Sequence, residues 1–463
     1  MLRYPLYLIS LILLSSCIKT ESQKEQIKLP KEISAEVLHR VESGINQGIA
    51  IATIDSIGNI NYYNFGTASS EGEAISENSL FEIASLSKTF TSTLIKELAL
   101  EHQFSLDSSI VAYLPDSFPE AIKQITFQEL INHTSGLARL PIDFWAKDWS
   151  NPYQNYSEQE FIEDLDALEL DSAHQWNYSN LGYALLGYII ERNFDMSLQN
   201  FIDEIGLTSS LLLVTGKNEM TSPHNFGVKV SHWGFPHSLS YLGGIKSTTK
   251  DLAQYVKYLQ EHNPVFQALL HDSNDVEINY AQSLYMNDGW LVDKTSAERI
   301  VFHNGISGGY SSFIGYQAFT KKGIIILSNS QSSIDIIGLS YLSDVFKITP
   351  AKKDVSFLLE KLIERKQLDS LSIVWESYDS LNYIQSLGAC YWLQCNSISN
   401  KDYKAALALN KLMMNDFPDD WEVYFYRGKI YQEMGETEKA VHFFDQVDSL
   451  FPSNQFMEQH RRK

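Results

Sequence analysis

The hydrophobic pattern near the start of the chain changes from a helical to a strand-like period. Residues 32–45 repeat apolar positions at helical spacing, which predicts an amphipathic helix. Residues 48–54 and 60–65 are rich in β-branched and aromatic side chains, and the turn-forming residues 56–59 separate them, so we expect a β-hairpin. A long helical pattern then covers residues 85–100.

Further strands are predicted far along the chain, at residues 300–302, 313–317 and 323–328, followed by a closing helix at 335–346. The intervening part is mostly helical with long loops. Strands at both ends with helices between them predict one α/β (α+β) domain over residues 32–349. Its antiparallel sheet would be built from both ends and flanked by helices, beside a mainly helical subdomain.

One helix start in this middle part carries a specific signal. Thr126 and Glu129 have the spacing of a capping box, in which a threonine side chain and a glutamate three residues later cap each other's backbone N–H groups. We expect the helix that follows to end near Gly136.

Residues 354–463 change character and are almost entirely helical. Ala406 and Ala440 are 34 residues apart (440 − 406), and so are Pro418 and Pro452 (452 − 418). Tyr424, Gly428, Tyr431 and Phe444 lie at the corresponding offsets of a repeat, so residues 400–454 resemble the tetratricopeptide family. So short an array seldom stands alone, so we expect it to pack against the preceding domain or to bind a protein partner. A plain helical cap without a binding role is the alternative.

The first residues have the form of a processing signal. One basic residue precedes an apolar run over residues 6–14, too short to span a bilayer, and the run ends in Leu14-Ser15-Ser16-Cys17. This ending resembles a bacterial lipobox, which implies a signal peptide over residues 1–16 and lipidation of Cys17. Residues 17–31 would then be a flexible tether. We expect the protein in the cell envelope, lipid-anchored to a membrane and facing the periplasm or the exterior; an uncleaved signal is the alternative.

The formal net charge is −21 and the isoelectric point is near 5.0. Such acidity argues against nucleic acid as a partner, because phosphate binding needs clustered lysine and arginine. It also means that contact with an anionic membrane depends on the anchor. The three cysteines form no disulfide framework, and we expect Cys390 and Cys395 to be buried as small apolar side chains. No metal or organic cofactor is implied.

The central chemical element is Ser85-Leu86-Ser87-Lys88. A serine hydroxyl becomes a nucleophile when a base takes its proton, and a lysine one helical turn away serves if its pKa is lowered. The spacing alone is weak, because Ser16 with Lys19 and Ser247 with Lys250 repeat it. Only Ser85 follows an apolar approach and begins a good helix.

Two later motifs stand in order behind Ser85. Tyr178-Ser179-Asn180 lies 93 residues after it (178 − 85), and His303-Asn304-Gly305 lies 125 residues further (303 − 178). With their flanks, these motifs resemble the serine β-lactamase and penicillin-binding protein superfamily. The likeness is to its branch of class C β-lactamases, D-alanyl-D-alanine carboxypeptidases and esterases. Other tyrosines also have asparagine two positions on, and His232-Trp233-Gly234 repeats the third pattern, so order and flanks carry the resemblance.

The resemblance implies a role for each residue. Ser85 would attack and become acylated, Lys88 would take or relay its proton, and Tyr178 would shuttle a proton to the leaving group and activate the deacylating water. Asn180 would hold the amide of the substrate. The backbone N–H groups of Ser85 and of Ile306, which follows Gly305, would bind the oxyanion.

His303 departs from the lysine that the triplet often carries. A histidine is mostly neutral at pH 7, so attraction to a substrate carboxylate is weakened. Esters, less charged amides and other D-amino acid peptides become more plausible substrates than β-lactams or a free D-alanine carboxylate. His133 and Ser135 could suggest a Ser-His-Asp triad, but the resemblance implies turn residues there.

These observations favour an extracytoplasmic serine hydrolase that acts on an amide, ester or lactam bond through an acyl-serine intermediate. The alternative is a catalytically inactive protein of the penicillin-binding fold, which binds an envelope partner through its helical repeats. A third possibility is that the concave face of the repeats is the main working surface.

Overall fold

The computed structural model describes residues 28–69, 71–141, 144, 150–167, 170, 175–213, 220–262, 266, 269–270, 275–278, 281–295 and 299–450. The predicted signal peptide, Cys17 and most of the predicted tether lie outside these residues. Leu29 is already buried, and the first helix begins at Lys31. Within the described part of the chain, every helix is too short or too polar to cross a membrane.

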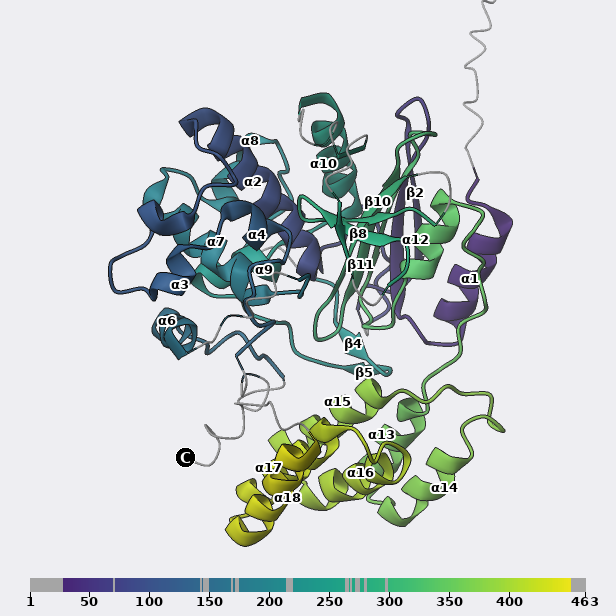
Figure 1. The fold of residues 1–463 in the computed structure, drawn as a ribbon. Coiled ribbons are helices and arrows are strands. Elements are labelled where there is room, and N and C mark those ends of the chain that lie inside the picture. The colour runs from purple at the N-terminus through teal and green to yellow at the C-terminus, as the bar shows by residue number, and fades with distance from the viewer. Residues whose placement is uncertain are drawn as a thin grey trace, which may run out of the picture.

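The described residues form an eight-stranded sheet in which the two ends of the domain meet (Figure 1). Strand β1 (Gly48–Ile54) pairs antiparallel with β2 (Ile60–Gly66) on one side and with β12 (Gly323–Ser328) on the other. The predicted antiparallel sheet built from both ends is therefore confirmed. The order continues from β12 through β11 (Ser311–Gln317), β10 (Ile300–Ile306), β9 (Trp290–Asp293), β8 (Leu284–Asn287) and β7 (Val276–Glu277).

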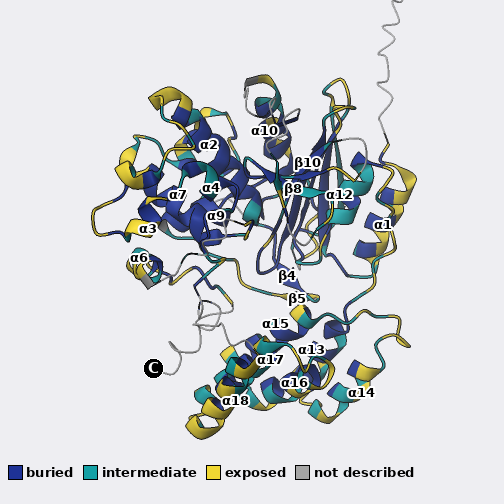
Figure 2. Cartoon of the chain, in the orientation of Figure 1, coloured by how far each residue is buried: buried dark blue, intermediate teal, exposed yellow. Residues whose placement is uncertain are grey.

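Alternate residues of the sheet face two different cores. Ile49 and Ile51 of β1 pack on the side covered by α1 (Lys31–Glu42) and α12 (Asp335–Leu342), whereas Ala50 and Ala52 face the larger core. Figure 2 shows the central strands in the colour of buried residues, and β1, β11 and β12 are buried at every position. On the larger side lie α10 (Thr249–His262) and the helical subdomain. A sheet covered on both faces needs apolar residues at every position, which explains the continuous apolar runs of β1 and β12.

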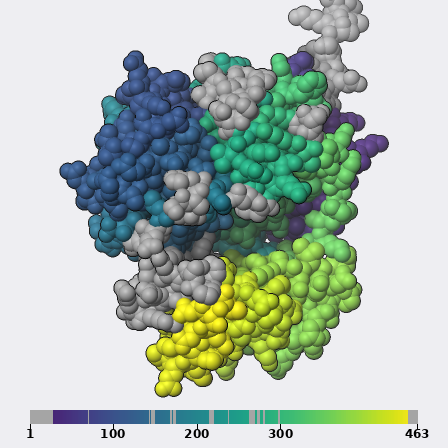
Figure 3. Space-filling view, viewed as in Figure 1, coloured from purple at the N-terminus to yellow at the C-terminus, as the bar shows by residue number. Residues whose placement is uncertain are grey.

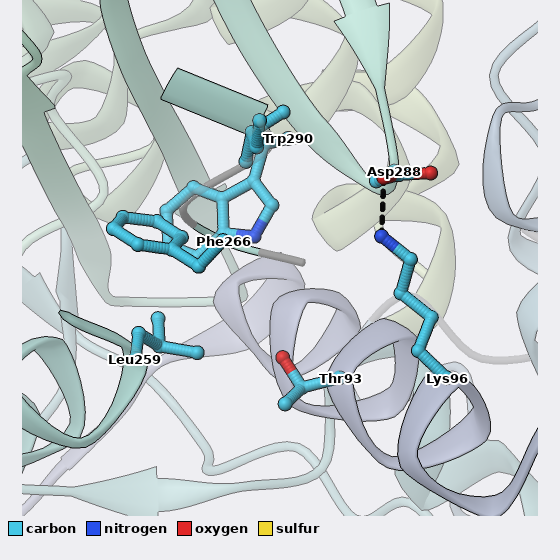
Figure 4. A pocket seen from close by; sticks show the side chains of 7 residues that line it. Thr93, Lys96, Leu259, Phe266, Asp288 and Trp290 are labelled. Atoms are coloured by element: carbon cyan, nitrogen blue, oxygen red, sulfur yellow. Dashed lines mark ion pairs between the residues drawn. The ribbon is translucent and has the colours of Figure 1, made fainter. Parts of the chain in front are cut away.

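The helical subdomain is centred on α2 (Ser87–His102) and α7 (Asn180–Asn193). Lys96 of α2 forms an ion pair with Asp288, in the turn between β8 and β9, beside a small pocket lined by Phe266 and Trp290 (Figure 4). This pair joins the subdomain to the sheet. The other helices here are α3 (Glu120–Lys123), α4 (Phe127–Ile131), α6 (Glu158–Ala167), α8 (Leu198–Glu204) and α9 (Ser240–Gly243), with short 3₁₀ turns at Ala84–Leu86, Ile110–Tyr113 and His237–Leu239.

Several predicted boundaries were wrong. Helix α4 begins after Thr126 with the expected capping box but ends at Ile131, well before Gly136. The cause is His133, whose backbone is left-handed (φ +59°) and cannot continue a helix. Strand β10 runs further than expected, to Ile306, and α12 ends at Leu342 rather than at residue 346.

The C-terminal helices form a separate core below the sheet domain (Figure 1). They make three successive hairpins. In the last of these, Gly428 lets α17 (Trp421–Glu433) approach Phe444 of α18 (Thr437–Leu450), because a Cβ at Gly428 would lie 2.4 Å from the ring. Cys390 and Cys395 are buried free thiols, as predicted. The membership of these C-terminal helices in the tetratricopeptide family stays a prediction. The helices are α13 (Ser356–Glu364), α14 (Leu371–Glu376), α15 (Leu387–Ser399), α16 (Tyr403–Asp416), α17 (Trp421–Glu433) and α18 (Thr437–Leu450), with a 3₁₀ turn at Leu368–Ser370.

The repeat module, residues 354–450, packs against the underside of the sheet domain (Figure 3). A two-stranded hairpin of β4 (His224–Asn225) and β5 (Val228–Lys229) reaches toward it. Phe226 at the hairpin tip makes edge contacts with the rings of Phe357 at 5.8 Å and Trp392 at 5.5 Å. The module therefore has an aromatic anchor on the preceding domain.

The capping box of α4 gives a local stability prediction. The Thr126 hydroxyl accepts a hydrogen bond from the Glu129 amide at 3.1 Å. Thr126→Ala removes this acceptor and should destabilise the first turn by about 1 kcal/mol, so the Glu129 amide should exchange with solvent about fivefold faster. Hydrogen exchange followed by NMR or mass spectrometry measures this. Thr126→Ser keeps the acceptor and should exchange like the wild type; equal acceleration in both variants would contradict the assignment.

Candidate active site

Ser85 lies in a strained turn at the start of the longest helix of the subdomain. Strand β3 (Phe81–Glu82) pairs with β6 (Lys246–Ser247), and the chain then enters a 3₁₀ turn directly before α2. Ala84, just before the serine, has a left-handed backbone (φ +47°) that costs energy for a residue with a Cβ. The turn leaves Ser85 half-buried while its neighbours are fully buried.

The structure brings together the three residues predicted to do the chemistry. The Tyr178 hydroxyl lies 2.9 Å from Ser85 Oγ, and Lys88 Nζ donates to the same oxygen at 3.3 Å. Lys88 also donates to the Leu242 carbonyl oxygen at 2.6 Å. The serine oxygen is thus in hydrogen-bond contact with both an amine and a phenol.

Lys88 is fully buried, and its described hydrogen-bond acceptors are uncharged oxygens. Burial holds the pKa of the Lys88 amine well below its usual value, and the positive charge of Arg139 lowers it further. Its Nζ also lies 5.0 Å from the centre of the Tyr178 ring. A lysine in this environment gives up its proton much more readily than one in water, as a general base requires.

His133 positions the segment that carries Tyr178. Its carbonyl oxygen accepts from the Asn177 amide at 2.8 Å, and its Nδ1 accepts from the Ser179 amide at 3.0 Å. The two aromatic rings of His133 and Tyr178 lie 4.3 Å apart. Because Nδ1 accepts, the imidazole is neutral there, and burial together with nearby cations lowers its pKa well below the usual value. His133 is therefore a turn residue, as expected, with a supporting role that the sequence did not reveal.

Arg139 is a second residue that the sequence did not single out. Its guanidinium lies 5.2 Å from the centre of the Tyr178 ring, and its carbonyl oxygen accepts from the Asn180 amide at 2.9 Å. Its place a few residues after His133 and Ser135, which the resemblance had marked as turn residues, was the one sequence signal for it. Its positive charge is placed to lower the proton affinity of Lys88.

Gly305 lies directly against the nucleophile turn. A Cβ at this position would lie 2.5 Å from the Ile83 carbonyl oxygen and 2.9 Å from the Ser85 backbone nitrogen, so only glycine fits. The end of β10 and the N–H of Ser85 are therefore neighbours. Ile306, the last residue of β10, is 48% exposed. This arrangement is compatible with the predicted pair of oxyanion donors.

His303 is buried in the sheet close to Lys88. Its Nδ1 lies 2.7 Å from the Asn304 carbonyl oxygen, which can only accept, so Nδ1 carries the proton. Burial and the charge of Lys88 lower the pKa of His303 to about 4. The imidazole is therefore neutral at pH 7, and more firmly so than an exposed histidine.

Asn180 opens α7 with its side chain buried. Its Nδ2 donates to the Tyr153 hydroxyl at 3.1 Å, and its Oδ1 is buried without a hydrogen-bond partner among the described residues. A buried amide oxygen without a partner is uncommon and suits a group that receives a ligand N–H. The competing pair of Ser247 and Lys250 forms no such site, because Ser247 is fully buried and bonded to Ser210.

The sheet built from both ends, the helical subdomain beside it and a serine that contacts a buried lysine and a tyrosine together define a β-lactamase-like fold. The family model of β-lactamase matches residues 35–336. The chain belongs to the β-lactamase family, and the family and fold predicted from the sequence are confirmed.

Among curated relatives, penicillin-binding protein 4* of Bacillus subtilis (strain 168) is 28% identical over 309 residues, which cover 59% of this chain and 66% of that protein. A β-lactamase of Providencia stuartii is 29% identical over 204 residues, or 42% of this chain and 51% of the relative. The chain thus spans between half and two thirds of the length of these relatives.

Solved structures share the fold. A class C β-lactamase has a TM-score of 0.60 at 21% identity and covers 71% of this chain and 99% of its own. A β-lactamase/D-alanine carboxypeptidase from Pseudomonas syringae has a TM-score of 0.55 at 22% identity, with coverage of 67% and 96%. At this identity the likeness concerns the fold alone.

The lowered pKa of Lys88 predicts a specific pH dependence of stability. In the unfolded chain the amine titrates near its usual value, so between the folded and unfolded pKa values the unfolded state binds more protons and stability rises with pH. The free energy of unfolding of the wild type should therefore gain on that of Lys88→Met as the pH rises from neutral toward 10, and level off above the unfolded pKa. Chemical denaturation of both proteins across this range measures the difference. A constant difference would mean that Lys88 keeps its usual pKa.

Proposed function

We propose that this protein is a serine hydrolase that cleaves an amide, ester or lactam bond through an acyl-serine intermediate. The observation that supports it best is the contact of Ser85 Oγ with both Tyr178 and Lys88, at 2.9 and 3.3 Å. An oxygen that has an amine base and a phenol within hydrogen-bond reach is equipped to lose a proton in one direction and return it in another.

In the proposed reaction, neutral Lys88 accepts the Ser85 proton while the serine oxygen forms a bond to the acyl carbon. The oxyanion is held by the backbone N–H groups of Ser85 and Ile306. Tyr178 then delivers a proton to the leaving group as the acyl bond breaks. For deacylation, the Tyr178 phenolate takes a proton from the attacking water, which bonds to the acyl carbon. The acyl–serine bond then breaks, protonated Lys88 returns its proton to the Ser85 oxygen, and the acid is released. Asn180 holds the amide of the substrate with its buried side chain.

The charges of the site favour substrates without a carboxylate beside the scissile bond. His303 occupies the position of a permanent cation in many relatives of this fold, and it is neutral at pH 7 because of its low pKa. It therefore offers less attraction to an anion than a lysine would. Esters, neutral amides and D-amino acid peptides fit the site better than a free D-alanine carboxylate.

The proposed place of action is the cell envelope. The lipobox-like sequence before Cys17 supports a lipid anchor, and the tether of residues 17–31 would let the enzyme work near the membrane surface. The repeat module offers a surface for a protein partner there.

Acylation of Ser85 is the direct test. Incubation with a fluorophosphonate probe or a penicillin should add the mass of one acyl or phosphonyl group to the intact protein, and Ser85→Ala should abolish the adduct. Ser247→Ala is the matched control, since Ser247 precedes Lys250 at the same spacing, and it should still be labelled. Intact-protein mass spectrometry reads both. A folded wild type that takes up no acylating reagent would favour the inactive binding protein instead.

The role of His303 gives a second test. His303→Lys places a cation on β10 beside Lys88, so kcat/KM should rise about tenfold for substrates with a carboxylate next to the scissile bond, relative to neutral esters. His303→Gln stays neutral and should show no such change. Steady-state kinetics on paired charged and neutral esters measures the ratio. Unchanged ratios in His303→Lys would mean that this side chain does not face the ligand.

A further inference from the structure

A cavity of about 300 Å³ lies between the sheet domain and the repeat module. It has walls from both: four large aromatic rings and a carboxylate surround it. The lining residues are Trp233, Gln331, Gly388, Tyr391, Trp392, Glu422 and Tyr426. None of them belongs to the chemistry proposed above, and a cavity of this size accepts a small organic group.

On the side of the sheet domain, Trp233 connects the cavity to the candidate active site. Its backbone N–H donates to Glu82 at 2.8 Å, on the strand that leads into Ser85. Its indole lies against Gly308, where a Cβ would be 2.4 Å from Nε1. Its ring is 5.7 Å from that of Tyr153, the partner of the Asn180 side chain. One wall of the cavity therefore contacts the strand that leads into Ser85.

On the side of the repeat module, three aromatic rings are held in place by packing. Trp392 contacts Phe226 of the domain junction, and the rings of Tyr391 and Tyr426 lie 5.2 Å apart. The Tyr391 hydroxyl is buried and has no hydrogen-bond partner in the described part of the chain. A buried phenolic hydroxyl without a partner is uncommon, and it can hydrogen-bond to a polar atom of a ligand.

Glu422 brings a negative charge to the rim of the same cavity. Glu422 is an exposed residue, but its carboxyl is partly desolvated. This desolvation, together with the nearby charge of Asp420, raises the pKa of the carboxyl. No described ion pair neutralises it. A carboxylate beside aromatic faces is therefore best compensated by a cation.

We propose that this cavity binds an alkylammonium group, with the aromatic rings around the cation and Glu422 as its counter-ion. Aromatic faces attract cations through their quadrupole, tryptophan most strongly, and aromatic cages are used to hold quaternary ammonium groups. An anion would be repelled by Glu422, and a purely apolar ligand would gain nothing from it. The net charge of −21 also draws cations to the protein.

Choline is a suitable probe, with its carbon isostere as the control, in which a tert-butyl group replaces trimethylammonium. Binding is measured on the full chain by tryptophan fluorescence and calorimetry, with Ser85→Ala in parallel, so that the result does not depend on hydrolysis. We expect choline to bind at least about tenfold more tightly than the isostere. Equal binding of both compounds, or binding of neither, would overturn the proposal.

Two substitutions on α17 and one on α15 complete the test. Glu422→Gln removes the counter-ion and should weaken choline binding about tenfold, whereas Glu433→Gln, on the exposed end of the same helix, should leave it unchanged. Trp392→Leu should weaken it as well, and circular dichroism shows whether that variant is folded. Equal loss in the two glutamine variants would contradict a local ion contact and point to general charge.

The ammonium group could belong to the substrate or to a separate small molecule, and kinetics distinguishes these sources. p-Nitrophenyl esters are compared whose acyl chain ends in trimethylammonium or in tert-butyl. A preference for the cationic ester that Glu422→Gln removes assigns the cavity to the acyl side chain, and this arm rests on the proposed hydrolase function. Choline binding without such a preference assigns it to a free ligand.

Discussion

The arrangement of this site depends on burying an amine without a carboxylate beside it. Lys88 of α2 is buried against α9, which carries Leu242, and its described hydrogen-bond acceptors are a carbonyl and a hydroxyl oxygen. A carboxylate partner would stabilise the ammonium form and keep its pKa high, whereas desolvation and the charge of Arg139 favour the free amine. The fold must supply the energy of this burial through the apolar packing around α2. The burial that lowers the pKa of Lys88 therefore also reduces the stability of the fold. Such a conflict is common at functional sites.

The surrounding structure keeps the reacting atoms in register with this amine. Ala84 accepts a left-handed backbone so that Ser85 points out of the turn, and Gly305 gives the turn room against β10. His133 fixes the Tyr178 segment through both its backbone and its ring. Each of these residues looks unremarkable by itself. Their common effect is that the phenol and the amine meet the same oxygen, although they come from parts of the chain that are distant in sequence.

The sequence predicted the sheet and singled out Ser85, Lys88 and Tyr178, which meet in the structure, but it did not predict the residues that hold them in place. Strand β1 and the capping box of Thr126 were visible because period and side-chain chemistry are local signals. Strands β7 to β9 were missed because runs of two to four residues have too little pattern to detect. The contacts of Arg139 and His133 with Tyr178 arise only when distant segments pack, and no local pattern encodes them. The pKa values of Lys88 and His303 depend on burial in the same way.

The charge states of Lys88, Arg139 and His303 form a consistent pattern around Ser85. Arg139 and, when it is protonated, Lys88 carry positive charge near Ser85, while burial is the main reason that His303 stays neutral. A lysine in place of His303 would add a further positive charge close to the amine and lower its proton affinity again. A neutral His303 in the middle of β10 thus suits a site in which the Lys88 amine is already strongly desolvated. Under the proposed function, the same choice would also weaken attraction to substrate carboxylates, so substrate preference and the basicity of Lys88 would both depend on the residue at position 303.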